Sequence, residues 1–219
     1  RFERGTGPVP KLAAAGNLGG LLSASAGYIE QFGNLVLPSG RITLNGSSGV
    51  VLGAGSVTDA AGRELHFPDY RTDSPGGEIR VAAGSGDLRV EAGAQLNVSG
   101  AVTQGDAGQL RLDAGDGNLY VDAGAVLVGT RHSDVSRSAD IAINAAALTG
   151  MNFSDLNGAL NAGGFNGTRS FRIYGASPEV SLSDGSEIDA ARFRLVVEQG
   201  GASVNGRIVA QDAAGLASV

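Results

Sequence analysis

The segment GEIRVAAGSGDLRVEAGAQLNVSG, residues 77–100, contains a pattern that returns further along the chain. The same template appears in GQLRLDAGDGNLYVDAGAVLVG at residues 108–129 and in RSFRIYGASPEVSLSDGSEIDA at residues 169–190. With DIAIN (residues 140–144) placed between the last two, the first apolar residues of the units are Ile79, Leu110, Ile141 and Phe171. The steps between them are 31, 31 and 30 residues, and this regularity is typical of a repeat architecture.

Each unit contains three short stretches of alternating apolar and polar residues. The later apolar positions fall nine residues after the unit start, at Leu88, Leu119 and Val180, and seventeen residues after it, at Leu96, Leu127 and Ile188. Alternation of period two places the apolar side chains on one face of a strand. Strands this short must pair with the same strands of the next unit, about 4.8 Å away. The pattern predicts an all-β chain folded as a right-handed parallel β-helix (β-solenoid), with three short strands per coil and about seven coils.

The repeat also predicts which side chains stack on one another. We expect two inward ladders, Ile79/Leu110/Ile141/Phe171 and Val81/Leu112/Ile143/Ile173, and an outward column of Arg80, Arg111 and Arg172 beside Glu78, Gln109 and Asp140. A glycine at the corner of each unit, at Gly93, Gly124 and Gly185, suits a turn that needs a positive φ. A shorter upstream coil is marked by Ile42, Val51 and Val57, and a final coil by Phe193, Leu195, Val204 and Ile208.

We interpret residues 1–219 as a single β-helical segment with insertions at about residues 59–76 and 145–168. The chain begins at Arg1 without an initiator methionine, so we expect an excerpt of a longer protein. In the second insertion, the apolar residues Phe153, Leu156, Leu160 and Phe165 have the spacing of a short amphipathic helix that caps or shields the core.

Composition excludes several classes of function. The chain has a net charge of −6 and no clustered basic segment, so neither nucleic acid nor a membrane surface is an expected partner. No apolar run approaches the roughly 20 residues of a membrane span. The absence of cysteine excludes disulfides, thiolate nucleophiles and cysteine-bound metals.

The units GDLRVEAGAQLNVSG and GNLYVDAGAVLVG, together with FSDLNGALNAGGFNGTRSFRI and FRLVVEQGGASVNGRIVAQDAAG, resemble the filamentous haemagglutinin family of large exoproteins. The resemblance implies a β-helical shaft of an adhesin that is exported by two-partner secretion, through an outer-membrane transporter partner. It also implies a secreted protein attached to the bacterial cell surface that contacts host cells, other bacteria or the matrix polysaccharide of a biofilm. The Asn-Pro motifs of the family's secretion domain are absent from this sequence, so we expect part of the shaft.

Parallel β-helices also include polysaccharide lyases and hydrolases, which use paired carboxylates. Glu91 and Asp122 stand at the same position of successive units, but in EAG and DAG turns that suit solubilising corner residues. A second alternative is structural calcium at Asp113, Asp116 and Asp122, although the Gly-Asp repeat of calcium-binding β-rolls is missing. We therefore expect no enzyme, no catalytic residue, no cofactor and no metal site.

The best candidate for a binding site is the insertion at residues 63–75. It gathers His66, Phe67, Tyr70, Arg71 and Asp73, and aromatic rings beside charged groups suit a carbohydrate ligand. One interpretation is a carbohydrate-binding module that uses this loop, projecting from the rod, or the outward arginine column. The other is that Phe67 and Tyr70 fold back and cover the side of the rod.

Overall fold

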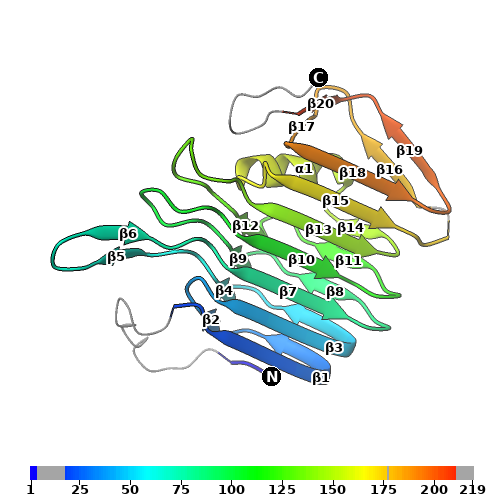
Figure 1. Cartoon of the computed structure of the whole chain (residues 1–219). Coiled ribbons are helices and arrows are strands. Elements are labelled where there is room, and N and C mark those ends of the chain that lie inside the picture. Colours follow the sequence, from blue (N-terminus) through cyan, green and yellow to red (C-terminus); the bar gives the residue numbers. More distant parts are fainter. Residues whose placement is uncertain (4–17, 177, 211–219) are drawn as a thin grey trace.

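The computed structural model describes residues 1–3, 18–176 and 178–210, and it confirms an all-β chain (Figure 1). The described strands stack side by side and run parallel to one another, apart from one hairpin. One helix, α1 (Phe153–Ala162), lies among them. Apart from the hairpin strands, each strand belongs to one of three rows, which we number in the order in which the chain visits them.

The first row runs across the whole stack. It consists of β1 (Leu21–Gln31), β3 (Arg41–Leu52), β7 (Glu78–Ala83), β10 (Gln109–Asp113), β13 (Asp140–Ala145), β15 (Thr168–Ile173) and β18 (Arg192–Val197). Because β1 and β3 are long, they bend and continue into the second row, so the two rows form one curled ten-stranded sheet.

The second and third rows consist of shorter strands. The second row continues with β8 (Leu88–Val90), β11 (Leu119–Val121) and β14 (Leu148–Gly150), and a separate pair contains β16 (Glu179–Leu182) and β19 (Gly201–Val204). The third row contains β2 (Asn34–Val36), β4 (Val57–Asp59), β9 (Gln95–Asn97) and β12 (Val126–Val128), and a separate pair contains β17 (Glu187–Asp189) and β20 (Arg207–Val209). Both rows are therefore interrupted at the same level of the stack, beside α1.

The predicted register is confirmed over the regular units. Leu110 of β10 lies between Ile79 of β7 and Ile141 of β13, and all three side chains are buried. The same step of one unit pairs β8 with β11 and β9 with β12. The inward aliphatic side chains form one continuous core cluster that extends from Ile29 to Ala190.

The corner glycines have the predicted conformation. Gly93, Gly124 and Gly185 have φ of 79°, 93° and 75°, in the region that side chains disfavour. A second set of glycines directly precedes the first-row strands. At Gly77 and Gly108, a Cβ atom would collide with the carbonyl oxygen of the corresponding glycine one unit earlier. Successive units can therefore approach closely at this corner only because it lacks side chains.

Two parts of the predicted ladders are wrong. Phe171 lies beside Ile143, not Ile141, because Arg169 takes the inward position beside Ile141. The register is thus displaced by two residues. A shift of two leaves each residue on the same face of the sheet, but it puts a buried arginine in the ladder. In the upstream unit, Val50 and Thr58 occupy the inward positions that pair with Leu88 and Leu96. The predicted markers Val51 and Val57 are therefore each one residue away from the inward positions.

Helix α1 is the amphipathic helix predicted in the second insertion, and it lies where the third row is interrupted. Its N-cap Asn152 accepts a hydrogen bond from the Asp155 amide at 2.9 Å. Phe153, Leu156, Leu160 and the following Phe165 are all buried, which confirms that the helix shields the core. It contacts β12 on one side and β16 and β17 on the other.

Two polar side chains connect α1 to the strands that follow it. Ser154 Oγ donates to the Ser181 carbonyl at 3.1 Å and accepts from the Ser183 amide at 2.8 Å. Asn161 does the same on β17, donating to the Glu187 carbonyl at 2.8 Å and accepting from the Asp189 amide at 3.1 Å. In a parallel sheet, a neighbouring strand supplies such a donor and acceptor from its backbone. Here two side chains replace it.

The core around α1 differs from the aliphatic core of the regular units. Phe153 packs edge-on against Phe171, with ring centroids 5.1 Å apart, and Phe193 lies within 6.5 Å of both rings. Arg169 is fully buried beside them and donates to the Phe165 carbonyl at 2.7 Å and to Asn157 Oδ1 at 3.2 Å. Burial lowers the pKa of Arg169 to about 10, with Asp189 opposing the shift, so the guanidinium remains charged at neutral pH.

Candidate functional site

The first insertion forms a β-hairpin that projects from the stack (Figure 1). Strands β5 (Glu64–His66) and β6 (Arg71–Asp73) pair antiparallel, with His66 opposite Arg71 and Glu64 opposite Asp73. The base of the hairpin is fixed by Ser74, whose hydroxyl accepts from the Arg63 amide at 2.7 Å and from Ser39 Oγ at 2.7 Å. The hairpin is therefore anchored to the preceding unit and directs its tip into solvent.

The aromatic residues occupy the tip of this hairpin. The rings of Phe67 and Tyr70 are stacked, with centroids 4.6 Å apart and planes inclined by 13°. Phe67 is 40% exposed and Tyr70 is 59% exposed. The interpretation that they fold back to cover the rod is therefore wrong: they pack on each other and present an apolar surface to solvent.

The charged residues of the hairpin divide into two groups. Glu64 lies between His66 Nε2, at 3.2 Å, and Arg71 NH1, at 3.4 Å, so the structure brings these two predicted residues together through a third. Asp73 stands apart, because its Oδ1 is buried and has no hydrogen-bond partner in the structure. The sequence prediction missed Glu64, although its position two residues before His66 places both on one face of a strand.

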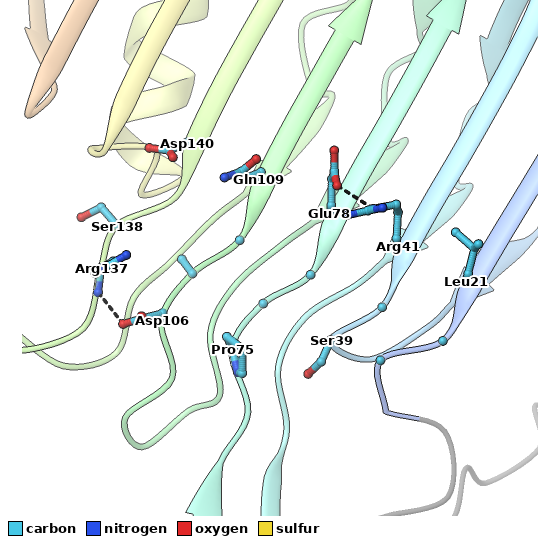
Figure 2. Close-up of a pocket in the computed structure, with 17 residues that line it drawn as sticks. Leu21, Ser39, Arg41, Pro75, Glu78, Asp106, Gln109, Arg137, Ser138 and Asp140 are labelled. Carbon is cyan, nitrogen blue, oxygen red and sulfur yellow. Dashed lines mark hydrogen bonds and ion pairs between the residues drawn. The ribbon is translucent and has the colours of Figure 1, made fainter.

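A polar hollow of about 690 Å³ lies beside the base of the hairpin, where the first-row strands begin (Figure 2). Backbone at Gly40, Gly77 and Gly108 forms part of its lining. Arg41 donates to Glu78 at 2.7 Å, and the Arg137 amide donates to Asp106 Oδ1 at 2.8 Å. The hollow thus has a glycine-rich surface and charged side chains of both signs.

Two further hollows adjoin it along the stack. One of about 390 Å³ reaches Thr168 and Arg192, and one of about 160 Å³ lies over Ala142 and Ser170 on the outer surface of the first row. Asp140 lines all three, and its Oδ1 accepts from the Thr168 amide at 2.6 Å. Sequence reasoning placed Gln109 and Asp140 side by side next to the arginine column, but it missed the hollows, which depend on the register of β15.

The enzymatic alternative gains nothing from the geometry. Glu91 Oε2 accepts a hydrogen bond from the Ala54 amide at 2.9 Å, so it stabilises the corner of the preceding unit. Neither Glu91 nor Asp122 lines any of the three hollows.

The calcium alternative depends on Asp113, Asp116 and Asp122. Asp113 Oδ1 accepts from the Gly115 amide and from Asn144 Nδ2, each at 3.0 Å. Within the described ranges, no three histidine or carboxylate side chains are grouped so as to hold a metal ion. The same part of the chain has no helix with the length and hydrophobicity needed to cross a membrane.

Comparison with protein-family models, with curated proteins and with solved structures finds no match to this chain. A functional interpretation therefore depends on the fold, the hairpin and the hollows themselves.

Proposed function

We propose that this chain is a right-handed parallel β-helix of about seven coils that serves as the noncatalytic shaft of a secreted adhesin on a bacterial surface. The observation that supports it most is the in-register parallel pairing of the first-row strands, from β1 to β18, over one continuous core. Because each unit contacts only its two neighbours, adding units lengthens such a stack along one axis. Its function is to give reach and rigidity.

The physical basis for rigidity is the direction of the hydrogen bonds. Backbone bonds such as Gln109 N to Gly77 O, at 2.9 Å, and Asp140 N to Gly108 O, at 3.1 Å, connect one unit to the next along the stack. Extending the rod requires many such bonds to break together, along with exposure of the aliphatic ladder. A rod built in this way transmits force with little change in length.

The resemblance to the filamentous haemagglutinin family supplies the biological setting of the proposal. Its most specific segment, FSDLNGALNAGGFNGTRSFRI, corresponds to α1 and β15, the irregular level of the stack. Under this proposal the chain is exported through an outer-membrane transporter partner and remains attached to the cell surface. It then contributes to attachment, to aggregation or to contact with matrix polysaccharide.

Single-molecule force spectroscopy tests the mechanical function. A chain tethered at its two ends should lengthen in discrete steps, each releasing one or more units of roughly 31 residues, or about 100 Å per unit. Smooth extension at low force, as for an unstructured chain, would refute a shaft. Release of sugar fragments from acidic polysaccharides by the purified chain would refute the noncatalytic assignment.

A carbohydrate-binding module is the second candidate function, and the exposed Phe67–Tyr70 stack favours it. An aromatic surface beside Arg71 and His66 can pack against a sugar ring while the charged groups bind its hydroxyls. A glycan array should then show binding that is lost in Tyr70→Ala and kept in Val135→Ala, an exposed apolar residue of another loop. Equal signals from the two variants would exclude the hairpin as the binding site.

A further inference from the structure

The outer surface of the first row is positively charged, although the whole chain has a net charge of −6. Six outward arginines stand on the strands from β3 to β18, namely Arg41, Arg80, Arg111, Arg172, Arg192 and Arg194. The same strands carry only three carboxylates, Glu78, Asp113 and Asp140. Six of the sixteen basic residues thus stand on one surface, where they outnumber the carboxylates and attract anions.

Several of these guanidinium groups are not neutralised by the protein. Among the described residues, no ion pair or side-chain hydrogen bond involves the exposed Arg80, Arg192 or Arg194. The same holds for the guanidinium of Arg137, which lines two of the hollows. Arg41 and Arg111 both lie within 3.5 Å of Glu78, so this single carboxylate is shared by two guanidinium groups and leaves one positive charge over. Arg137 and Arg192 line hollows together with Asp140, and Arg194 stands on β18 beside Ser170.

The column of side chains next to Asp140 contains a gap that a ligand fits. In register across β10, β13, β15 and β18 stand Arg111, Ala142, Ser170 and Arg194. The two small residues in the middle line the hollow of about 160 Å³ with Arg111 at one end, and Arg194 is the next residue of the column beyond Ser170. Three strand steps separate these arginines, or about 14 Å. One strand step is close to the length of one pyranose unit in a linear chain, so successive sugars would meet successive strands.

The remaining groups limit the chemistry of the ligand. Asp140, Asp106 and Gln109 can accept hydrogen bonds from hydroxyl groups, while the arginines require anionic groups. A linear chain of uronic acids supplies both in every residue. Densely sulfated chains and DNA bring anions without enough hydroxyl donors for the carboxylates, and the column has no aromatic side chain on which bases stack.

We propose that this surface, centred on Ala142 and Ser170, binds a linear polyuronate laid along the stack, with its carboxylates on Arg111, Arg192 and Arg194. Hydroxyl groups of the same sugars donate to Asp140 and Gln109. The proposal adds a ligand and a site to the shaft, and it does not use the hairpin. A rod that binds no uronate is still a rod, so the two proposals fail separately.

Isothermal titration of the full chain with alginate, a linear polyuronate, tests the proposal. We expect binding that weakens with salt and that is at least tenfold weaker in Arg194→Gln and in Ala142→Phe, which fills the hollow. Arg207→Gln is the matched control, because Arg207 is an exposed arginine on β20, away from this surface. It should bind within twofold of the wild type, and neutral dextran should not bind.

The proposal is overturned if alginate does not bind the wild-type chain, or if Arg207→Gln weakens binding as much as Arg194→Gln. Binding of dextran sulfate or single-stranded DNA in preference to alginate would also overturn it. Circular dichroism and limited proteolysis of each variant report separately on the fold, so loss of binding with an unchanged fold concerns the site alone.

Discussion

The regular units at residues 77–129 and the irregular level at residues 145–190 build the same stack by different means. The regular units pair backbone with backbone at a constant step and fill the core with aliphatic side chains. The irregular level replaces a strand with α1, fills the core with aromatic rings and buries a charged arginine.

The difference shows what the stack requires from each level. The edges of β16 and β17 need a hydrogen-bond donor and an acceptor at the correct spacing, and Ser154 and Asn161 provide both from side chains. The helix therefore terminates one set of strands and supports the next. Periodicity is one solution among several, and core continuity is the property common to both regions.

The largest effect is expected in the regular region. Leu110→Asp would place a carboxylate at a position that is 0% exposed, between Ile79 and Ile141. Burying an unpaired charge there should cost more than about 4 kcal/mol and unfold the neighbouring units. Urea denaturation and limited proteolysis measure this loss.

Arg80→Asp is the matched control for that substitution. Arg80 is exposed on the same row and adjoins Arg111, so an aspartate there gains an opposite charge beside it. Its effect on the free energy of unfolding should remain within about 1 kcal/mol. Full protease resistance of Leu110→Asp would contradict the buried ladder.

The next effect concerns the irregular region. Arg169→Met keeps much of the side-chain volume but leaves the Phe165 carbonyl and Asn157 Oδ1 without their donor. We expect a loss of about 3 kcal/mol in unfolding free energy, with opening confined to residues 145–190 at first. Arg169→Lys retains the charge but not the planar donor geometry, so its stability should fall between that of the wild type and that of Arg169→Met. A variant as stable as the wild type would contradict a supporting role for this arginine.

The regular region was predictable because every unit repeats one local rule. Alternation identified the inward residues of 77–129, and glycine spacing identified the corners. The same rule failed at Arg169, because a charged residue in an inward position is stabilised there by acceptors from α1 and from the residues after it, which the sequence does not place. Ser154 and Asn161 look like ordinary polar helix residues until β16 and β17 are positioned beside them.

The binding surfaces were predictable to different degrees. The hairpin was identified by its aromatic and charged composition, although the connecting role of Glu64 and the burial of Asp73 were not. The hollows around Asp140 depend on the register shift at β15, which brings Ser170 rather than Arg172 beside Ala142. A prediction that assumed the constant step placed Arg172 there and filled the gap with charge.

The smallest effect depends on pH. Partial burial raises the pKa of Tyr174, and the nearby carboxylates of Asp113 and Asp116 add to the shift, while Arg172 opposes it. Since the folded state favours the neutral phenol, this stabilisation is present below about pH 10, the ordinary pKa of tyrosine, and is lost as pH rises through the folded value. Wild type should therefore lose stability faster than Tyr174→Phe above pH 10, in thermal unfolding at stepped pH. Parallel curves would show that the irregular level is not coupled to these carboxylates.

Amide hydrogen exchange tests most directly whether α1 replaces a strand. The amides of Ser183 and Asp189 should exchange slowly in the wild-type chain, because Ser154 Oγ and Asn161 Oδ1 accept from them. Ser154→Ala should accelerate exchange at Ser183, and Asn161→Ala should accelerate it at Asp189, each by about tenfold or more, while Leu112 in the regular region is unchanged. Fast exchange at both amides in the wild type, or rates that neither substitution alters, would contradict the account.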